Sequence, residues 1–287
     1  MDDIKAGEKT VLDINDIDWN GMWNKTLQKM PRENEKNRWN KIAPQFNKWM
    51  KTDEYPLNFA EKVHKKSDYT VLDLGCGNGS VTLEVAKYVK QVTAVDISEE
   101  MLKLVQKNAA ANGISNIEYI QSSIEDIEVD EIGQYDVVIA SRSLGSIKNL
   151  QKELKKIDRI AKKYVYMTHW SATGNQLEKD LCKVTGITHY PHPDYIYVCN
   201  MLYQMDIYAN LEPINCSSRH VYRDLNDAVE RHMWKLGWTA NNIKKEKRME
   251  IEDYLKKKLV KIENGTLEYT TTNPSWMLLW WEKGNHH

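Results

Sequence analysis

A short apolar run that stops at closely spaced glycines is the feature that most limits how this chain can fold. Residues 70–74 read Thr-Val-Leu-Asp-Leu, and Gly75, Gly77 and Gly79 follow before a helical pattern begins at Ser80. A strand that passes through a glycine-rich turn into a helix brings backbone N–H groups close to a ligand, with no side chains in the way. The sequence therefore predicts a ligand-binding turn at these glycines.

An acidic residue follows at the distance expected for a nucleotide-type ligand. A second apolar run, residues 91–95, ends in Asp96, about 20 residues after the glycines. In folds of this kind the acid at the tip of the second strand accepts hydrogen bonds from ribose hydroxyls. We predict that Asp96 binds a ribose.

The glycine spacing separates two classes of ligand. The order is Gly-x-Gly-x-Gly over residues 75–79, with Asp73 before it, and not the Gly-x-Gly-x-x-Gly of dinucleotide binders. This stretch resembles motif I of the class I S-adenosylmethionine-dependent methyltransferases, and Asp96 matches the acid of their second motif. The resemblance extends from about Trp39 to Trp170. The alternative is a generic Rossmann-like turn, or an NAD enzyme with a shortened loop.

The resemblance implies S-adenosylmethionine as the cofactor. It implies that Asp73 reaches the ammonium group or orders the turn, and that the helix of Trp39 either closes over the cofactor or only packs on the domain. The family usually has an Asp after its third strand that contacts adenine, but Ser123 stands there, so Ser123 or Glu125 is expected to make that contact. The expected cofactor-binding residues are Trp39, Asp73, Gly75, Cys76, Gly77, Gly79, Asp96, Ile97, Met101, Ser123, Ile124, Glu125 and Ser141.

The remaining pattern predicts an α/β fold. Further apolar strands are expected at residues 117–121, 135–140 and 164–168, with helical stretches between them. Such alternation is typical of a doubly wound, mostly parallel sheet, the fold that the resemblance also implies. The expected parts are an N-terminal helical segment (1–55), a cofactor-binding α/β core (56–172), a cap insertion (173–212), and late strands and helices that complete the core and lid (213–287).

The ends of the fourth and fifth strands carry the polar residues expected near the transferred methyl group, because ligands of open α/β sheets bind at the carboxyl ends of strands. Methyl transfer from a sulfonium depends mainly on aligning a nucleophile and controlling its proton. We expect Arg142 to bind an anionic group and His169 to accept a proton; the alternatives are a surface arginine and a hydrogen-bonded cleft histidine. The expected substrate-binding residues are Arg142, His169, Trp170, Tyr190, Tyr197 and Tyr203, where the tyrosines either line the pocket or pack the cap.

The amino-acid composition limits the kinds of partner that the protein is expected to bind. The 287 residues include 40 basic and 41 acidic side chains, a net charge of -1 that lacks the basic excess of nucleic-acid binders. The four cysteines form no Cys-x-x-Cys pair, and the loop with His189, His192 and Asp194 is more typical of solvated residues, so no metal site is expected. No apolar run is long enough to span a bilayer and the first residues are polar, so we expect a cytoplasmic protein.

These features predict methyl transfer to a small-molecule acceptor, although they identify neither the acceptor atom nor an oligomeric state. Two alternatives stay open. One is a protein or RNA methyltransferase that docks through the basic run at residues 244–248. The other is a cofactor-binding protein without turnover.

Overall fold

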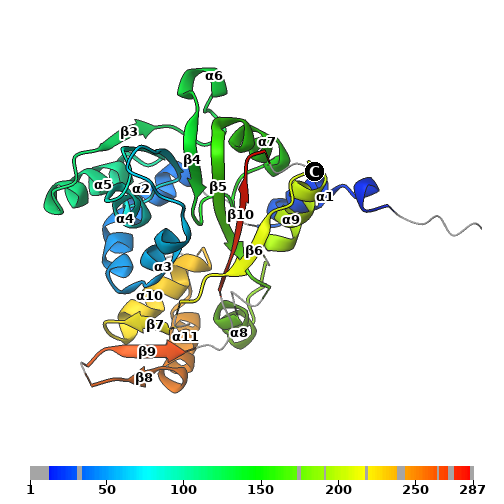
Figure 1. Cartoon of the computed structure of the whole chain (residues 1–287). Helices are drawn as coiled ribbons and strands as arrows, with labels where there is room; N and C mark the ends of the chain where they lie inside the picture. The colour runs from blue at the N-terminus through cyan, green and yellow to red at the C-terminus, as the bar shows by residue number, and fades with distance from the viewer. Residues whose placement is uncertain are drawn as a thin grey trace, which may run out of the picture.

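A mostly parallel sheet forms the centre of the structure, a computed structural model that describes residues 13–30, 34–172, 176–190, 192–216, 219–237, 243–263, 265–270 and 275–284. The sheet has seven strands in the order β3-β2-β1-β4-β5-β10-β6 (Figure 1). The first five strands run parallel, and β10 runs antiparallel to both of its neighbours, β5 and β6, so β6 points the same way as the first five. The strands are β1 (Thr70–Leu74), β2 (Gln91–Asp96), β3 (Ile117–Gln121), β4 (Tyr135–Ala140), β5 (Ala161–Trp170), β6 (Asn210–Pro213) and β10 (Trp276–Glu282). This confirms the predicted fold class.

The order of the strands determines where a ligand can bind. The chain builds β2 and β3 on one side of β1 and then returns to build β4 and β5 on the other. The connections therefore leave β1 and β4 in opposite directions, and such a switch point opens a crevice at the carboxyl ends of the strands.

Helices cover both faces of the sheet and bury its alternating side chains (Figure 1). One face packs against α3 (Tyr55–Lys62), α4 (Ser80–Ala86) and α5 (Glu99–Ala111). The opposite face packs against α1 (Trp19–Gln28), α7 (Leu150–Ile160) and α9 (Tyr195–Tyr203). Helix α2 (Glu35–Trp49) lies against α5, and short helical turns complete this part: η1 (Ile14–Asp16), η2 (Met50–Thr52) and α6 (Val129–Ile132).

Local signals account for the helix that follows β2. Ser98 caps α5 by accepting a 3.1 Å hydrogen bond from the Met101 N–H, and Glu99 and Glu100 lie in the first turn, where carboxylates stabilise a helix. The helix ends at Asn112, and Gly113 follows with φ +68°. Signals local in the sequence thus set both ends of this helix.

A small subdomain lies below the main sheet in Figure 1. It has a core of its own, built around Leu181, Tyr222 and Met233. Its elements are a three-stranded sheet and three helices: α8 (Gln176–Thr185), β7 (Arg219–Tyr222), α10 (Leu225–Lys235), α11 (Lys245–Lys258), β8 (Val260–Lys261) and β9 (Leu267–Thr270).

The structure distributes the expected cap insertion over both parts. Within residues 173–212, α8 joins the small subdomain, whereas α9 packs on α1 and α7, and β6 pairs with β10 in the main sheet. Helix α9 ends at Tyr203, and Asp206 has φ +58° shortly afterwards. Of the expected N-terminal helical segment, residues 1–12 and 31–33 lie outside the described residues.

No helix within the described ranges is long and apolar enough to cross a membrane.

Candidate functional site

A cavity of about 1520 Å³ opens where β1, β2, β4 and β5 end, and continues to the small subdomain. One end is lined by the glycine turn and Asp96. The other end is lined by residues of α8, β7, α10 and β10. Pockets for one drug-sized ligand typically measure roughly 300–1,000 Å³, so this cavity has room for a cofactor and a second molecule.

The glycine turn presents bare backbone to the cavity. The Gly75 and Cys76 N–H groups donate to the Val95 carbonyl at 2.8 and 2.9 Å, which fastens the turn to β2. Gly75 has φ +75°, and an added Cβ would lie 2.4 Å from the Ser143 Cβ. Gly77 has φ +56°, and an added Cβ would project to 3.7 Å from the Phe46 ring, in the cavity lining. Side chains at these positions would strain the backbone and fill the space of a ligand.

Asp96 is held in position by two backbone donors. Its Oδ2 accepts from the Gly77 N–H and its Oδ1 from the Ser98 N–H, each at 2.8 Å. Burial raises the pKa of this carboxyl. Each carboxylate oxygen has a further lone pair, so Asp96 can still accept hydrogen bonds from two hydroxyls on a ligand. This arrangement fits a ribose.

Asp73 lies beneath the turn with one oxygen unsatisfied. Its side chain is 1% exposed, and its Oδ2 accepts from the Thr82 hydroxyl at 2.6 Å. Its Oδ1 is buried and has no hydrogen-bond partner within the described part of the chain. Burial, with a smaller contribution from the charge of Asp96, raises the pKa of Asp73 to about 7. A buried acceptor without a donor fits the ammonium group of S-adenosylmethionine, which would satisfy and charge-balance it.

The expected adenine end includes a residue that the sequence analysis did not select. Ser123, Ile124 and Glu125 line the cavity, but the Ser123 hydroxyl donates to Asp126 Oδ2 at 2.7 Å and accepts from the Asp126 N–H. Asp126 itself lines the cavity. Its carboxylate is therefore a further candidate for the adenine contact. The sequence feature that could have indicated Asp126 is its place three residues after Ser123, a spacing typical of a turn capped by a serine side chain.

Most expected cofactor residues come together in this cavity. All of them line it except Gly79, where an added Cβ would lie 2.7 Å from Val105 Cγ1. Gly79 thus allows α4 and α5 to pack closely. Trp39 lines the cavity, donates from its Nε1 to Glu35 at 3.1 Å, and packs edge-on against Phe46 and Trp234.

The expected substrate residues divide into two groups. Arg142, Trp170 and Tyr190 line the cavity, whereas His169, Tyr197 and Tyr203 do not. Tyr197 lies edge-on to Trp19 and Trp23, because α9 packs its aromatic face on α1. Tyr203 is 44% exposed and contacts Tyr208.

His169 lies on the face of β5 that packs against α1. Its ring is 5.3 Å from the Trp23 ring, is 2% exposed, and has no partner among the described residues at either nitrogen. Burial, with a smaller effect of His192, lowers its pKa to about 3. Side chains alternate along a strand, and Thr168 next to it points the other way, to the Tyr55 hydroxyl. A proton-accepting role would need access to the cavity that this position does not provide.

Arg142 lines the cavity with its charge already balanced. Its Nη1 donates to Asp53 Oδ2 at 2.8 Å, and its guanidinium lies 3.9 Å from the Tyr55 ring centroid. Its φ of +58° is a strained conformation for a side chain with a Cβ, and its N–H donates to the Thr168 hydroxyl. Burial opposes ionisation of Asp53, but the Arg142 charge outweighs it and lowers the pKa of Asp53.

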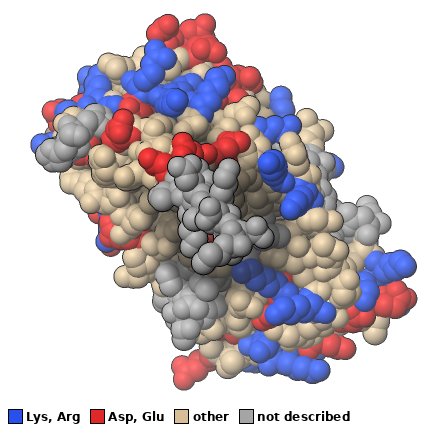
Figure 2. Space-filling model, turned by 90° about the vertical axis from the view of Figure 1, so that its right-hand side faces the viewer, with Lys and Arg blue, Asp and Glu red and all other residues tan. Residues whose placement is uncertain are grey.

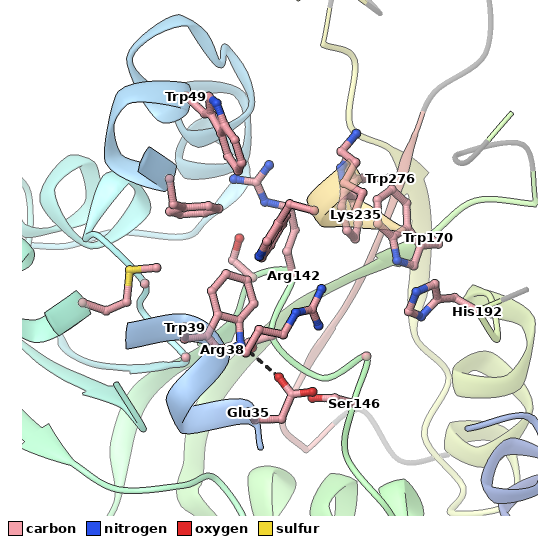
Figure 3. Close-up of a pocket in the computed structure, with 18 of the residues that line it drawn as sticks. Glu35, Arg38, Trp39, Trp49, Arg142, Ser146, Trp170, His192, Lys235 and Trp276 are labelled. Atoms are coloured by element: carbon pink, nitrogen blue, oxygen red, sulfur yellow. Dashed lines mark hydrogen bonds between the residues drawn. The ribbon is translucent and has the colours of Figure 1, made fainter. Parts of the chain in front are cut away.

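The far end of the cavity joins the expected residue Trp170 to several that the sequence did not indicate, among them Trp234 and Trp276. The rings of Trp170 and Trp276 stack at 3.8 Å, and the Trp234 ring lies 5.2 Å from that of Trp39. Figure 3 shows Trp170, Trp276, Lys235 and His192 on one side and Arg38, Trp39 and Glu35 on the other, with Arg142 between them. The other unselected residues of this end are Glu178, His220 and Arg231. The only sequence signal was the high content of Trp and Tyr, 10 and 15 residues.

Comparisons with known proteins agree with this geometry. A family model described as "Methyltransferase domain" matches residues 65–211. An uncharacterized protein of Haemophilus influenzae is 30% identical over 251 residues, 85% of this chain and 88% of that protein. A ubiquinone biosynthesis O-methyltransferase of Vibrio parahaemolyticus is 26% identical over 204 residues, 67% of this chain and 85% of that protein. The crystal structure of a putative methyltransferase from Bacillus halodurans has a TM-score of 0.55 at 21% identity, over 79% of this chain and 98% of that one, which shows the shared fold.

Proposed function

Because the chain belongs to the class I S-adenosylmethionine-dependent methyltransferases, we propose that it transfers the methyl group of that cofactor to a small-molecule acceptor. The observation that carries this proposal is the continuity of the cavity. One volume of about 1520 Å³ joins the glycine turn to an aromatic end. The second molecule would lie between the sheet and the small subdomain.

In this proposal, one end of the cavity binds the cofactor and the other binds the acceptor. S-adenosylmethionine supplies a methyl group on a sulfonium, which needs no acid to leave. Asp96 and Asp73 fit its ribose and ammonium groups. The aromatic side chains of the far end, Trp170, Trp234 and Trp276, exclude water and hold a planar acceptor in line with the methyl group, which is the main source of rate in such a transfer.

The surface supports a small acceptor over a nucleic acid. In the basic run at the start of α11, Lys247 pairs with Glu250 at 3.0 Å and Arg248 with Glu230 at 2.8 Å. On the face shown in Figure 2, basic side chains form separate groups near the top and below the centre, with acidic side chains beside them, and no basic surface runs across the face among the residues drawn in colour. A phosphate backbone is bound by a basic surface whose charges are free to replace its counterions.

The test is incubation with methyl-labelled S-adenosylmethionine and a fractionated cell extract. The proposal predicts label in the small-molecule fraction, with none from an Asp96→Ala variant. Label in the protein or RNA fraction would replace the proposal with the macromolecular alternative. Cofactor binding without label in any fraction would support a protein without turnover.

A further inference from the structure

Arg231 presents an incompletely balanced positive charge to the cavity. Its side chain is 13% exposed, and its buried Nε has no acceptor among the described residues. The carboxylate nearest to it, Asp227, lies 3.9 Å from Nη2. Burial lowers the pKa of Arg231. A buried donor without an acceptor is costly, so a ligand that supplies one would bind favourably here.

Asp227 does not supply that acceptor, because its Oδ2 lies 3.9 Å from Arg231 Nη2, beyond hydrogen-bond distance, and other donors hold its carboxylate in place. Its Oδ1 accepts from the Trp49 Nε1 at 2.9 Å, and its Oδ2 accepts from the Arg223 N–H at 3.1 Å. Asp227 is 2% exposed and joins α10 to α2 through Trp49. Turning it toward Arg231 would leave these donors unsatisfied.

Two other cations at this end of the cavity have carboxylate partners. Arg142 pairs with Asp53 at 2.8 Å, and Lys235 pairs with Glu178 at 2.9 Å. Arg38 has no ion pair among the described residues and lies over the Trp234 ring at 4.8 Å, but Arg231 is the arginine of the cavity with a fully buried unpaired donor. His192 Nδ1 and Trp234 Nε1 are also buried without a partner among the described residues, but Arg231 is the one of these three groups that carries a positive charge at neutral pH.

The geometry around Arg231 favours a planar anion. Its guanidinium lies over the Trp49 and Tyr222 rings at 5.3 and 5.0 Å, and the N–H donors of a guanidinium lie along its edge, in the plane of the group. A guanidinium edge matches a carboxylate, which accepts two parallel hydrogen bonds.

The charge of the cavity favours a single negative charge. Burial opposes ionisation of Asp53 and Glu178, but Arg142 and Lys235 outweigh it and lower the pKa of both. Both acids are therefore charged at neutral pH, and each balances the cation beside it. Arg231 then leaves one positive charge to match, which a carboxylate does and a dianion such as a phosphate monoester exceeds. The stacked Trp170 and Trp276 rings line the same cavity and suit an aromatic ring.

We propose that the acceptor is a small aromatic carboxylate, whose carboxylate group binds the N–H edge of Arg231. This inference rests on the proposed function, since it names the chemical class of the second molecule. The carboxylate is a binding group, so Arg231 determines specificity and takes no proton.

The probes are benzoate, benzamide and phenyl phosphate, titrated calorimetrically into protein saturated with S-adenosylhomocysteine. Benzoate is expected to bind at least ~10-fold more tightly than benzamide, because a hydrogen bond to a charged group contributes about 1.5–3 kcal/mol. Arg231→Met should remove that preference, and Arg231→Lys should restore part of it. Arg223→Met is the matched control, because Arg223 also lies near Asp227 but is 59% exposed and outside the cavity lining.

Affinity for S-adenosylhomocysteine, measured first for each variant, shows whether the fold is intact. If Arg231→Met does not fold, Arg231→Lys provides the test, because it should lower the affinity for benzoate and leave the affinity for benzamide unchanged. Absence of benzoate binding, equal binding of benzamide, tighter binding of phenyl phosphate, or an unchanged preference in the Arg231 variants would each overturn the inference. Label found outside the small-molecule fraction, with an Arg231-dependent benzoate site, would instead remove the proposed function and keep the anion site.

Discussion

Asp96 accepts a 2.8 Å hydrogen bond from the backbone N–H of Gly77. This bond couples the acid at the end of β2 to the middle of the glycine turn, so the proposed ribose site and the bare backbone are held together before a ligand binds. Such preorganisation lowers the entropy that a ligand loses on binding.

Asp96→Ala should weaken cofactor binding at least ~10-fold, because it removes charge-assisted hydrogen bonds worth about 1.5–3 kcal/mol each. Calorimetry with S-adenosylmethionine measures the effect. Asp96→Asn is the isosteric control; it keeps one acceptor oxygen and should bind with intermediate affinity. An Asp96→Ala affinity within about twofold of the parent would mean that the ribose is held elsewhere.

Cofactor affinity should fall as the pH drops below 7. Burial raises the pKa of Asp73 to about 7. We propose that the cofactor's ammonium group binds the ionised carboxylate, so binding below pH 7 must displace a proton. The affinity should then decrease by up to ~10-fold per pH unit on the acid side and level off above pH 7. Titration at several pH values checks this, and Asp73→Asn should flatten the profile. An affinity that rises on acidification would contradict the assignment.

His169→Leu should leave methyl transfer within about twofold of the parent and keep or raise the melting temperature, since it replaces two unsatisfied buried nitrogens with an apolar group. Kinetics and thermal unfolding measure both. A large loss of kcat, with loss of an ionisation from the pH profile, would instead support the proton-accepting role expected from the sequence.

Trp276→Ala should impair methyl transfer at least ~10-fold while leaving cofactor affinity unchanged, because it removes the stacked wall of the acceptor end. Label transfer to extract fractions and calorimetry measure the two quantities. Tyr203→Ala is the control, because Tyr203 is exposed outside the cavity. If Trp276→Ala and Tyr203→Ala lowered methyl transfer equally, the proposal that the acceptor binds at the far end of the cavity would be wrong.

Contiguous residues made the cofactor end predictable. This end depends on backbone conformation and helix capping, and both are determined by residues close together in the chain. The signals are the first strand, the glycine turn, Asp96 and Ser98. The expected cofactor residues accordingly lie together in the structure, apart from Gly79.

The residues of the far end of the cavity could not be predicted from the sequence in the same way. Arg231 and Trp276 come from α10 and β10, far along the chain from the glycine turn, and only tertiary packing brings them to one cavity. For His169, a place at the end of a strand does not reveal which face it occupies, because one residue along a strand reverses the face. For Tyr197, helical spacing indicates a buried side but not which helix covers it.

The most direct test of the account is calorimetry of S-adenosylhomocysteine binding to Gly77→Val. Gly133→Val is the matched control, because both glycines have positive φ, +56° and +76°, but only Gly77 lines the cavity. We predict that Gly77→Val loses binding while Gly133→Val keeps the parent affinity. Unchanged affinity in a folded Gly77→Val variant would contradict the central claim that the cofactor binds against this turn.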